Sequence, residues 1–190
     1  MNRTSAKNRL LNAAADLFYT DGIAGTGIDK ITAQAGVAKM SLYNNFASKA
    51  DLVEAYIDRR CDEWHELLQR RLSQAATPRE RVMAVFDSYV DHAELAYARG
   101  FRGCGLLNAA AELPLGDPGR ASVARQKAEV ESLFATYLAE MRPGAEVADV
   151  AEHLSFVLEG AMSRAGLEGH DGRLRAARRI ASALIDGVER

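Results

Sequence analysis

Residues 28–46 read IDKITAQAGVAKMSLYNNF, and this stretch decides the fold of the N-terminal part of the chain. Its first eight residues place apolar side chains at helical spacing on one face: Ile28, Ile31 and Ala35. Gly36 follows at once, and a glycine at this point can take the left-handed conformation that ends a helix sharply. A second short helix, Lys39–Asn45, then begins after a three-residue turn. Two short helices joined through such a turn predict a helix-turn-helix.

A supporting helix precedes this pair. Helices this short are unstable alone, so they need an apolar surface behind them. Residues 4–21 supply one, because they carry an apolar stripe at helical spacing: Leu10, Leu11, Ala14, Leu17 and Phe18. Leu42 and Phe46 of the second helix are expected to face that stripe.

Side chains that can read bases lie on the outer face of the predicted second helix. Lys39 can donate to guanine or to a phosphate, Asn44 can pair with adenine, and Ser41 can bond a base or a phosphate. Met40 can contact a thymine methyl group. A solvated helix face without any partner is the alternative, but the turn glycine, the inward apolar set and the supporting helix together favour DNA binding.

Other side chains nearby are expected to contact the DNA backbone. Tyr43 can offer its hydroxyl to a phosphate oxygen, and Lys49 has the same reach from the start of the next helix. Thr26 precedes a helix N-terminus, where a hydroxyl and free backbone N–H groups can bind an anion.

The apolar period is helical almost everywhere else, and no run alternates convincingly as a strand does. Thr77-Pro78 and Asp117-Pro118 read as an N-cap followed by the first helical residue. The sequence therefore predicts an all-α protein of about nine helices, with a helix-turn-helix DNA-binding domain over 1–48 and a second helical domain over 49–190. The expected helices are 4–21, 28–35, 39–45, 49–74, 78–98, 103–112, 118–141, 145–167 and 172–188.

Charge is unevenly distributed along the chain, whose net charge is −2. Residues 1–50 hold six basic and three acidic side chains, whereas the rest holds 18 basic and 23 acidic ones. A basic end on an acidic body is consistent with a nucleic-acid partner. No apolar run approaches the roughly 20 residues of a transmembrane helix, and the first residues do not form a signal peptide. A cytoplasmic protein without membrane contact is expected.

The stretch Ile28–Leu52 resembles the tetracycline-repressor (TetR) family, whose pattern is close to I-A-x-x-A-G-V-S-x-G-T-L-Y-x-Y/H-F-x-S-K-x-x-L. The resemblance implies a dimer that binds a two-fold symmetric operator in double-stranded DNA, usually represses a nearby gene, and is released by a small-molecule effector. It also implies that the following positions touch DNA: Thr26, Lys39, Ser41, Tyr43, Asn44 and Lys49.

Three positions depart from the family pattern. Met40 stands where the family often has glycine, and Thr32 stands where alanine is common. Asn45 replaces an aromatic residue or histidine that often reaches a phosphate. These departures affect which operator sequence is recognised and whether residue 45 contacts the DNA backbone.

The last two predicted helices carry small and branched apolar faces. In the resembled family this pair meets its symmetry mate as a four-helix bundle, and such faces suit close packing of helices. The alternative is that they cover only the core of the monomer. The candidate dimer interface comprises Ala151, Leu154, Leu158, Ala161, Ala177, Ala181, Leu184 and Val188.

An effector pocket is expected inside the C-terminal helices, although ordinary core packing is the alternative for each candidate side chain. Asn108 and Glu112, one helical turn apart, could present polar groups to a ligand. The full candidate set is Trp64, Phe86, Tyr89, Asn108, Glu112, Phe134, Tyr137 and Phe156.

Catalysis is not indicated, because the sequence has no nucleophile motif, phosphate-binding glycine loop or metal-ligand set. No catalytic residue, metal or cofactor is therefore expected. An enzyme that uses the C-terminal pocket, and a helical co-regulator or activator, remain alternative functions. Cys61 and Cys104 form no disulfide framework, and Cys104 could either sense redox state or simply fill space.

Overall fold

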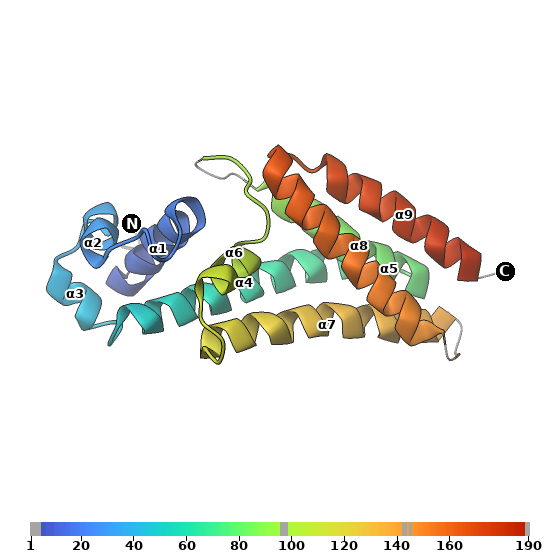
Figure 1. Cartoon of the computed structure of the whole chain (residues 1–190), viewed down its shortest axis with the longest axis horizontal. Helices are drawn as coiled ribbons and strands as arrows, with labels where there is room; N and C mark the ends of the chain where they lie inside the picture. The colour runs from blue at the N-terminus through green and yellow to red at the C-terminus, as the bar shows by residue number, and fades with distance from the viewer. Residues whose placement is uncertain (1–4, 96–98, 142–143, 145, 189–190) are drawn as a thin grey trace. The chain divides into compact units, whose positions relative to one another are not determined.

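The computed structural model describes residues 5–95, 99–141, 144 and 146–188. In these residues the chain forms α-helices and no strands, so the predicted all-α class is confirmed (Figure 1). The helices are α1 (Ala6–Asp21), α2 (Ile28–Ala35), α3 (Lys39–Tyr43), α4 (Lys49–Leu72), α5 (Pro78–Glu94), α6 (Gly105–Glu112), α7 (Pro118–Met141), α8 (Val147–Glu168) and α9 (Gly172–Val188).

The helices gather into two compact units. Unit 1 comprises residues 1–61, 97–99 and 105–123, and unit 2 comprises residues 62–96, 100–104 and 124–190. Helices α4 and α7 therefore each contribute residues to both units. The predicted boundary at residue 48 divides the chain by function, whereas the two units are defined by their compactness. The predicted boundary therefore stays a prediction.

Unit 1 is built on α1, which packs against α2, α3 and α6. Ser5 caps α1, because its hydroxyl accepts a hydrogen bond from the N–H of Asn8. Leu10 of α1, Ile31 of α2 and Leu42 of α3 are fully buried, so the expected apolar stripe does support the two short helices. Deleting a buried aliphatic side chain of this kind costs ~2–5 kcal/mol of folding free energy.

The turn between α2 and α3 is set by Gly36. This residue has φ +62°, and its N–H donates to the carbonyl oxygen of Ala33. The N–H of Val37 donates to the carbonyl oxygen of Thr32, which satisfies another carbonyl at the helix end. The second helix is shorter than predicted and ends at Tyr43, although N–H groups of the next residues still bond back to carbonyls of α3.

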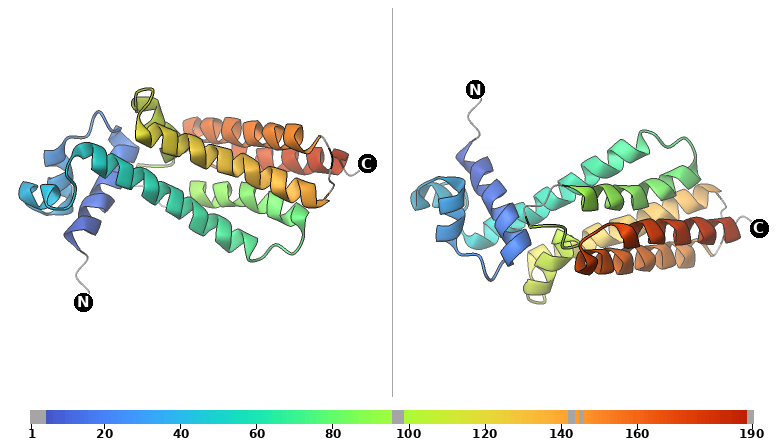
Figure 2. Two further views of the ribbon diagram at one scale, coloured as in Figure 1. Left: turned by 90° about the horizontal axis from the view of Figure 1, so that it is seen from below. Right: turned by 90° about the horizontal axis from the view of Figure 1, so that it is seen from above.

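Unit 2 contains α5, α8 and α9, in which α9 packs against both α5 and α8 (Figures 1 and 2). Its core includes Phe86 and Phe134, whose ring centroids lie 5.4 Å apart. The loop before α6 comes very close to α8, because a Cβ added at Gly166 would lie 2.6 Å from Cα of Gly103. Glycine is required at this crossing, since backbone atoms cannot move aside as a flexible side chain can.

The predicted start of α5 is confirmed. Thr77 and Glu80 form a capping box, in which the N–H of Glu80 donates to the Thr77 hydroxyl and the N–H of Thr77 donates to the Glu80 carboxylate. Pro78 is the first helical residue, where its missing N–H costs nothing. In α7, likewise, Pro118 is the first residue. No described helix is both long and apolar enough to cross a membrane.

Candidate nucleic-acid interface

The outer face of α3 presents the predicted base-reading side chains. Met40 is 69% exposed and Tyr43 is 48% exposed, and Lys39 and Asn44 are also exposed. Ser41 is half-buried. Because Leu42 between them is fully buried, α3 is anchored on one side and open on the other. The predicted inward and outward faces are confirmed, whereas the DNA contacts themselves stay predictions.

Lys39 already has a partner inside unit 1. Its Nζ lies 2.8 Å from Oδ1 of Asp29 on α2, and both side chains are more than half exposed. The hydrogen bond that Lys39 donates to the Asp29 carboxylate raises the pKa of Lys39, so the ammonium group stays charged. To contact DNA, Lys39 would have to leave the Asp29 carboxylate and bind a base edge or a phosphate instead.

Asn45 is used within the turn after α3. Its Nδ2 donates to the backbone carbonyl oxygen of Ser41 at 2.7 Å, and the side chain is half-buried. The amide thus satisfies a carbonyl at the end of α3, where the resembled family has an aromatic residue or histidine. Structural capping is the role that the geometry supports for Asn45.

Thr26 does not have the role expected from the sequence. It is fully buried, its hydroxyl donates to the carbonyl oxygen of Gly22 at 2.7 Å, and its N–H donates to that of Ile23 at 3.3 Å. The expected phosphate contact through the Thr26 hydroxyl is therefore wrong, because the turn between α1 and α2 uses that group internally.

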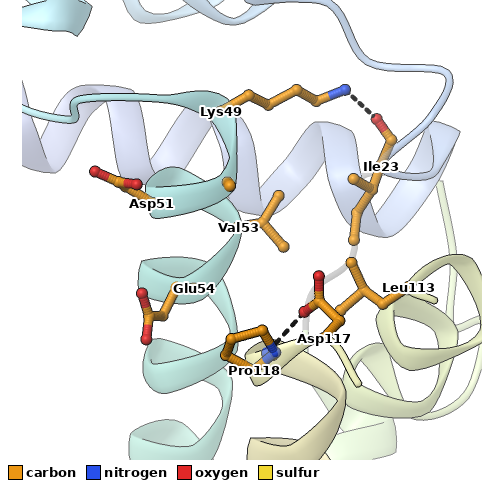
Figure 3. A pocket seen from close by; sticks show the side chains of 10 residues that line it. Ile23, Lys49, Asp51, Val53, Glu54, Leu113, Asp117 and Pro118 are labelled. Carbon is orange, nitrogen blue, oxygen red and sulfur yellow. Dashed lines mark hydrogen bonds between the residues drawn. The ribbon is translucent and has the colours of Figure 1, made fainter. Parts of the chain in front are cut away.

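Lys49 also bonds internally. Its Nζ donates to the carbonyl oxygen of Ile23 at 2.6 Å, as Figure 3 shows. The two residues line a cleft of about 300 Å³ together with Val53, Leu113 and Pro118. A phosphate contact of Lys49 would compete with this bond, so the structure supports first of all a role in fixing the α1–α2 turn.

Glu112 was expected in a ligand pocket, but the structure places it against the α1–α2 turn. Its Oε1 accepts from the N–H of Ile23 at 2.9 Å and its Oε2 accepts from the N–H of Ala24 at 2.7 Å. The residues are 88 and 89 positions apart in sequence, and no local pattern could have paired them. Asn108 of the same helix is exposed, so the expected inward polar pair is wrong.

Asp21 at the end of α1 is held by two cations. Lys30 Nζ lies 2.6 Å from Oδ2 and Arg99 Nη1 lies 2.7 Å from Oδ1. The hydrogen bond from Lys30, helped by Arg99, lowers the pKa of Asp21 despite the opposing effect of burial. The carboxylate therefore joins α1 to α2 as an ion at neutral pH.

The interior of unit 2 holds a polar cluster, defined here as Tyr89, Lys127, Cys104 and Glu159. Lys127 Nζ lies 2.9 Å from Oε1 of Glu159, 3.3 Å from the Tyr89 hydroxyl and 3.6 Å from Sγ of Cys104. Burial opposes the charge of Lys127, but its acidic neighbours outweigh burial and raise its pKa. Burial raises the pKa of Tyr89, which keeps its hydroxyl protonated.

Unit 2 also contains other buried polar groups. The ring of Trp64 lies edge-on to that of Tyr89, with centroids 6.3 Å apart. Within the described part of the chain, Trp64 Nε1 and both polar atoms of the Gln126 side chain have no hydrogen-bond partner, although Gln126 is only 4% exposed. Gln126 and Lys127 are residues that sequence reasoning missed, because a polar residue on a long charged helix gives no sign of burial.

The other expected pocket residues divide into two groups. Phe86, Phe134 and Tyr137 are buried in unit 2 together with Trp64 and Tyr89. Phe156 is 63% exposed, so the expectation that it lines an interior pocket is wrong. Among the described residues, no group of three or more His, Cys, Asp or Glu side chains gathers to hold a metal ion.

Most of the expected dimer-interface residues lie in the core of unit 2. Buried residues are Ala151, Leu154, Leu158, Ala177 and Ala181, while Ala161 is half-buried and Leu184 is 39% exposed. The side chain of Val188 lies outside the described residues. The alternative reading, that this face covers the monomer's own core, therefore applies to the buried five.

Different apolar side chains of α8 and α9 face outward. Phe156 and Leu167 on α8 are 63% and 86% exposed, and Ile180 on α9 is 52% exposed. Gly160, one turn after Phe156, is also exposed and has open space around it. A contiguous patch of exposed apolar side chains is typical of a surface that another protein covers, whereas single exposed ones are common.

Comparison with known proteins supports the reading of α1–α4. Residues 10–56 match the model described as "Bacterial regulatory proteins, tetR family". The chain is 32% identical over 92 residues to the transcriptional activator FasR of Mycolicibacterium smegmatis, covering 48% of this chain and 42% of FasR. It is 30% identical over 131 residues to the transcriptional repressor DhaR of Mycobacterium sp., covering 66% of this chain and 61% of DhaR. The matches thus span between about two fifths and three fifths of these relatives.

Solved structures resemble nearly the whole chain. A TetR-family transcriptional regulator from Streptomyces coelicolor superposes with a TM-score of 0.89 at 28% identity, covering 97% of this chain and 96% of that one. The regulatory protein TetR from Rhodobacter sphaeroides superposes with a TM-score of 0.79 at 26% identity, covering 94% and 98%. The similarity therefore extends through the C-terminal helices.

Proposed function

We propose that the chain, whose residues 10–56 match the model of the tetR family of bacterial regulatory proteins, is a transcriptional regulator of that family that inserts α3 into the major groove of operator DNA. One observation carries this proposal: α3 exposes Lys39, Met40, Tyr43 and Asn44 while Leu42 is fully buried. A rigidly anchored helix with an open polar face is what base readout requires. The relatives and neighbours named above are regulators rather than enzymes.

The functional division follows from this role. Residues 1–48 would read DNA, and residues 49–190 would dimerise and bind the effector. Helix α4 belongs to both compact units, since it carries Lys49 in unit 1 and Trp64 in unit 2. A shift of α4 is therefore the route by which an effector would change DNA affinity.

A homodimer is the second part of the proposal. A single half-site reader binds weakly, whereas two copies can contact half-sites about 34–36 Å apart. The exposed apolar side chains of α8 and α9, Phe156, Ile180 and Leu184, support an interface with a second copy of this chain. Burial of such side chains is the main favourable term in association.

A small-molecule effector is the third part. The unpartnered Gln126 and Trp64 atoms in unit 2 support an uncharged ligand with both hydrogen-bond donors and acceptors. The aromatic rings of Phe86 and Phe134 in the same unit favour a mainly apolar skeleton. We propose repression as the direction of control and the cytoplasm, where operator DNA would be bound, as the location. Because FasR is an activator and DhaR a repressor, a reporter gene behind the operator must decide the direction.

Selection from a random pool of duplex DNA tests the function. The wild-type protein is expected to enrich one two-fold symmetric sequence, whereas a variant with Lys39→Ala and Tyr43→Ala enriches none. The matched control changes two exposed residues away from α3, Glu54→Ala and Leu115→Ala, and should enrich the same sequence as the wild type. If the wild-type protein enriches no sequence, the proposed function is wrong.

A further inference from the structure

The carboxylate of Glu112 binds two successive backbone N–H groups of the α1–α2 turn. The oxygens accept from Ile23 at 2.9 Å and from Ala24 at 2.7 Å. Hydrogen bonds from neutral donors to an ion are stronger than those between neutral groups. This pair joins the last residue of α6 to the turn, and both belong to unit 1.

Gly22 is adapted to this contact. Its φ of +81° is a conformation that favours glycine, and a Cβ added there would lie 2.7 Å from Oε1 of Glu112. The carboxylate therefore sits directly against the backbone of the turn. Any larger residue at position 22 would push the carboxylate away.

The same turn is held from a second helix. Lys49 at the start of α4 donates to the carbonyl oxygen of Ile23 at 2.6 Å. Ile23 is thus fixed through its N–H by α6 and through its C=O by α4. The end of α6 is itself fixed, because Arg120 donates to the carbonyl oxygens of Ala110 at 2.8 Å and Leu113 at 3.2 Å.

The turn determines how α2 leaves α1, and α1 packs against both α2 and α3. A small displacement at the turn therefore changes the placement of the recognition helix, and hydrogen-bond readout of bases tolerates little displacement. We propose that Glu112 is a positioning residue for DNA recognition: its carboxylate fixes the α1–α2 turn, and withdrawal of α6 from this turn lowers the affinity for the operator. This inference rests on the proposed DNA-binding function.

The sign of the effect separates positioning from simple electrostatics. Removing an acidic side chain from a DNA-binding protein lessens repulsion of the phosphates and should strengthen binding. Loss of the positioning bonds should instead weaken it. Glu112→Gln leaves one amide oxygen to accept a bond, whereas Glu112→Ala leaves none.

The experiment measures binding to the duplex that the wild-type protein selects. We expect Glu112→Gln to raise the dissociation constant several-fold and Glu112→Ala to raise it about tenfold or more, as loss of charge-assisted hydrogen bonds should. The matched control is Glu54→Gln, which removes the same charge from an exposed residue of α4 in unit 1 and should bind equally well or better.

Amide hydrogen exchange shows whether the effect is local. In Glu112→Ala the amides of Ile23 and Ala24 should exchange faster than in the wild type, while the amides of Ile31 and Leu42 keep their protection. In Gly22→Ala the amide of Ala24 should likewise exchange faster than in the wild type, and the affinity for the selected duplex should fall by a similar amount. Its control, Gly27→Ala, has open space around position 27 and a negative φ, so the amides of Ile23 and Ala24 should keep their wild-type protection in it.

The inference is overturned if the Glu112 variants bind the selected duplex as well as Glu54→Gln does, or if Ile23 and Ala24 keep their protection in Glu112→Ala. It is also overturned if protection at Ile31 and Leu42 is lost together with affinity, because Glu112 would then support the fold of unit 1 in general. Failure of the wild-type protein to select any duplex refutes the proposed function instead, and exchange still reports whether Glu112 fixes the turn.

Discussion

Lys39 shows at the residue scale how one contact can tune a DNA-reading side chain. Its ammonium group pairs with Asp29 on the neighbouring helix, so binding to DNA must replace that pair and bring the Asp29 carboxylate close to phosphates. Exposed ion pairs contribute little to stability. If Lys39 contacts DNA as proposed, we therefore expect Asp29 to act mainly on DNA affinity.

The substitution Asp29→Asn should strengthen DNA binding. It frees Lys39 and removes a negative charge, so we expect about a three- to tenfold lower dissociation constant at low salt and a steeper dependence on salt concentration. Fluorescence anisotropy with the selected duplex at several salt concentrations measures both. Asp58→Asn, at an exposed position on α4, is the charge-matched control, and equal effects of the two changes would contradict a specific role of the Lys39–Asp29 pair.

Gln126→Leu should separate stability from effector response. Because the Gln126 amide is buried without a partner in the described residues, an apolar side chain of similar size should raise the free energy of unfolding by ~1 kcal/mol. The variant should no longer release the selected duplex when a compound that releases the wild type is added. Chemical denaturation and a release assay on a library of uncharged aromatic compounds test this. A destabilised variant with an unchanged response would contradict the assignment.

Single residues also show where sequence reasoning fails. The sequence correctly placed Lys39, Met40, Tyr43 and Asn44 on the outside, because periodicity within five residues determines a helix face. It could not place Lys49 or Glu112, because their partners are set by the tertiary fold. It also missed that the Thr26 hydroxyl bonds back to Gly22 within the turn. The Glu112 bonds span 88 and 89 residues, and a carboxylate on a short helix is usually just solvated.

At the element scale, α8 and α9 show that a helical period identifies faces without saying what covers them. The sequence correctly identified two amphipathic helices. It assigned their small and branched apolar residues to a dimer interface, but α9 packs against α5 and α8, and Leu154, Leu158 and Ala181 are fully buried within the single chain. Phe156 and Ile180 remain exposed instead. Because they do not follow the simple apolar stripe, only the fold reveals that they face outward.

The capping box of α5 gives stability that depends on pH. Backbone N–H groups of Thr77 and Ala76, helped by the Thr77 hydroxyl, lower the pKa of Glu80. Since the folded state favours the ionised form, Glu80 contributes stability above its ordinary pKa, and this contribution disappears as the pH falls through the lowered value. Between about pH 5 and about pH 3, the free energy of unfolding of Glu80→Gln should therefore fall less than that of the wild type.

Denaturant titrations at several pH values measure this difference. Glu66→Gln, at an exposed position of α4, serves as the control and should follow the wild type. Parallel pH profiles for Glu80→Gln and the wild type would show that the capping box does not contribute in this way.

At the scale of the whole molecule, the proposed function needs two copies of the chain. The exposed apolar side chains of α8 and α9 should lie in their interface, so introducing charge there should produce monomers. We expect sedimentation to show a dimer for the wild type and a monomer for the double variant Phe156→Glu and Ile180→Glu. Leu115→Glu, at an 88% exposed position outside these helices, should stay dimeric. A monomeric wild type, or a dimeric double variant, would contradict the assigned interface.

The central claim is that α3 reads bases, and the sequence selected by a variant of its outer face tests it most directly. The measurement compares the duplexes that the wild type and Asn44→Ala enrich from one random pool. We predict that the wild type enriches a two-fold symmetric site and that Asn44→Ala loses its preference at one symmetric pair of base positions, with the other positions unchanged. Identical base preferences for the two proteins, at equal folded fraction, would contradict the claim that Asn44 on α3 contacts bases.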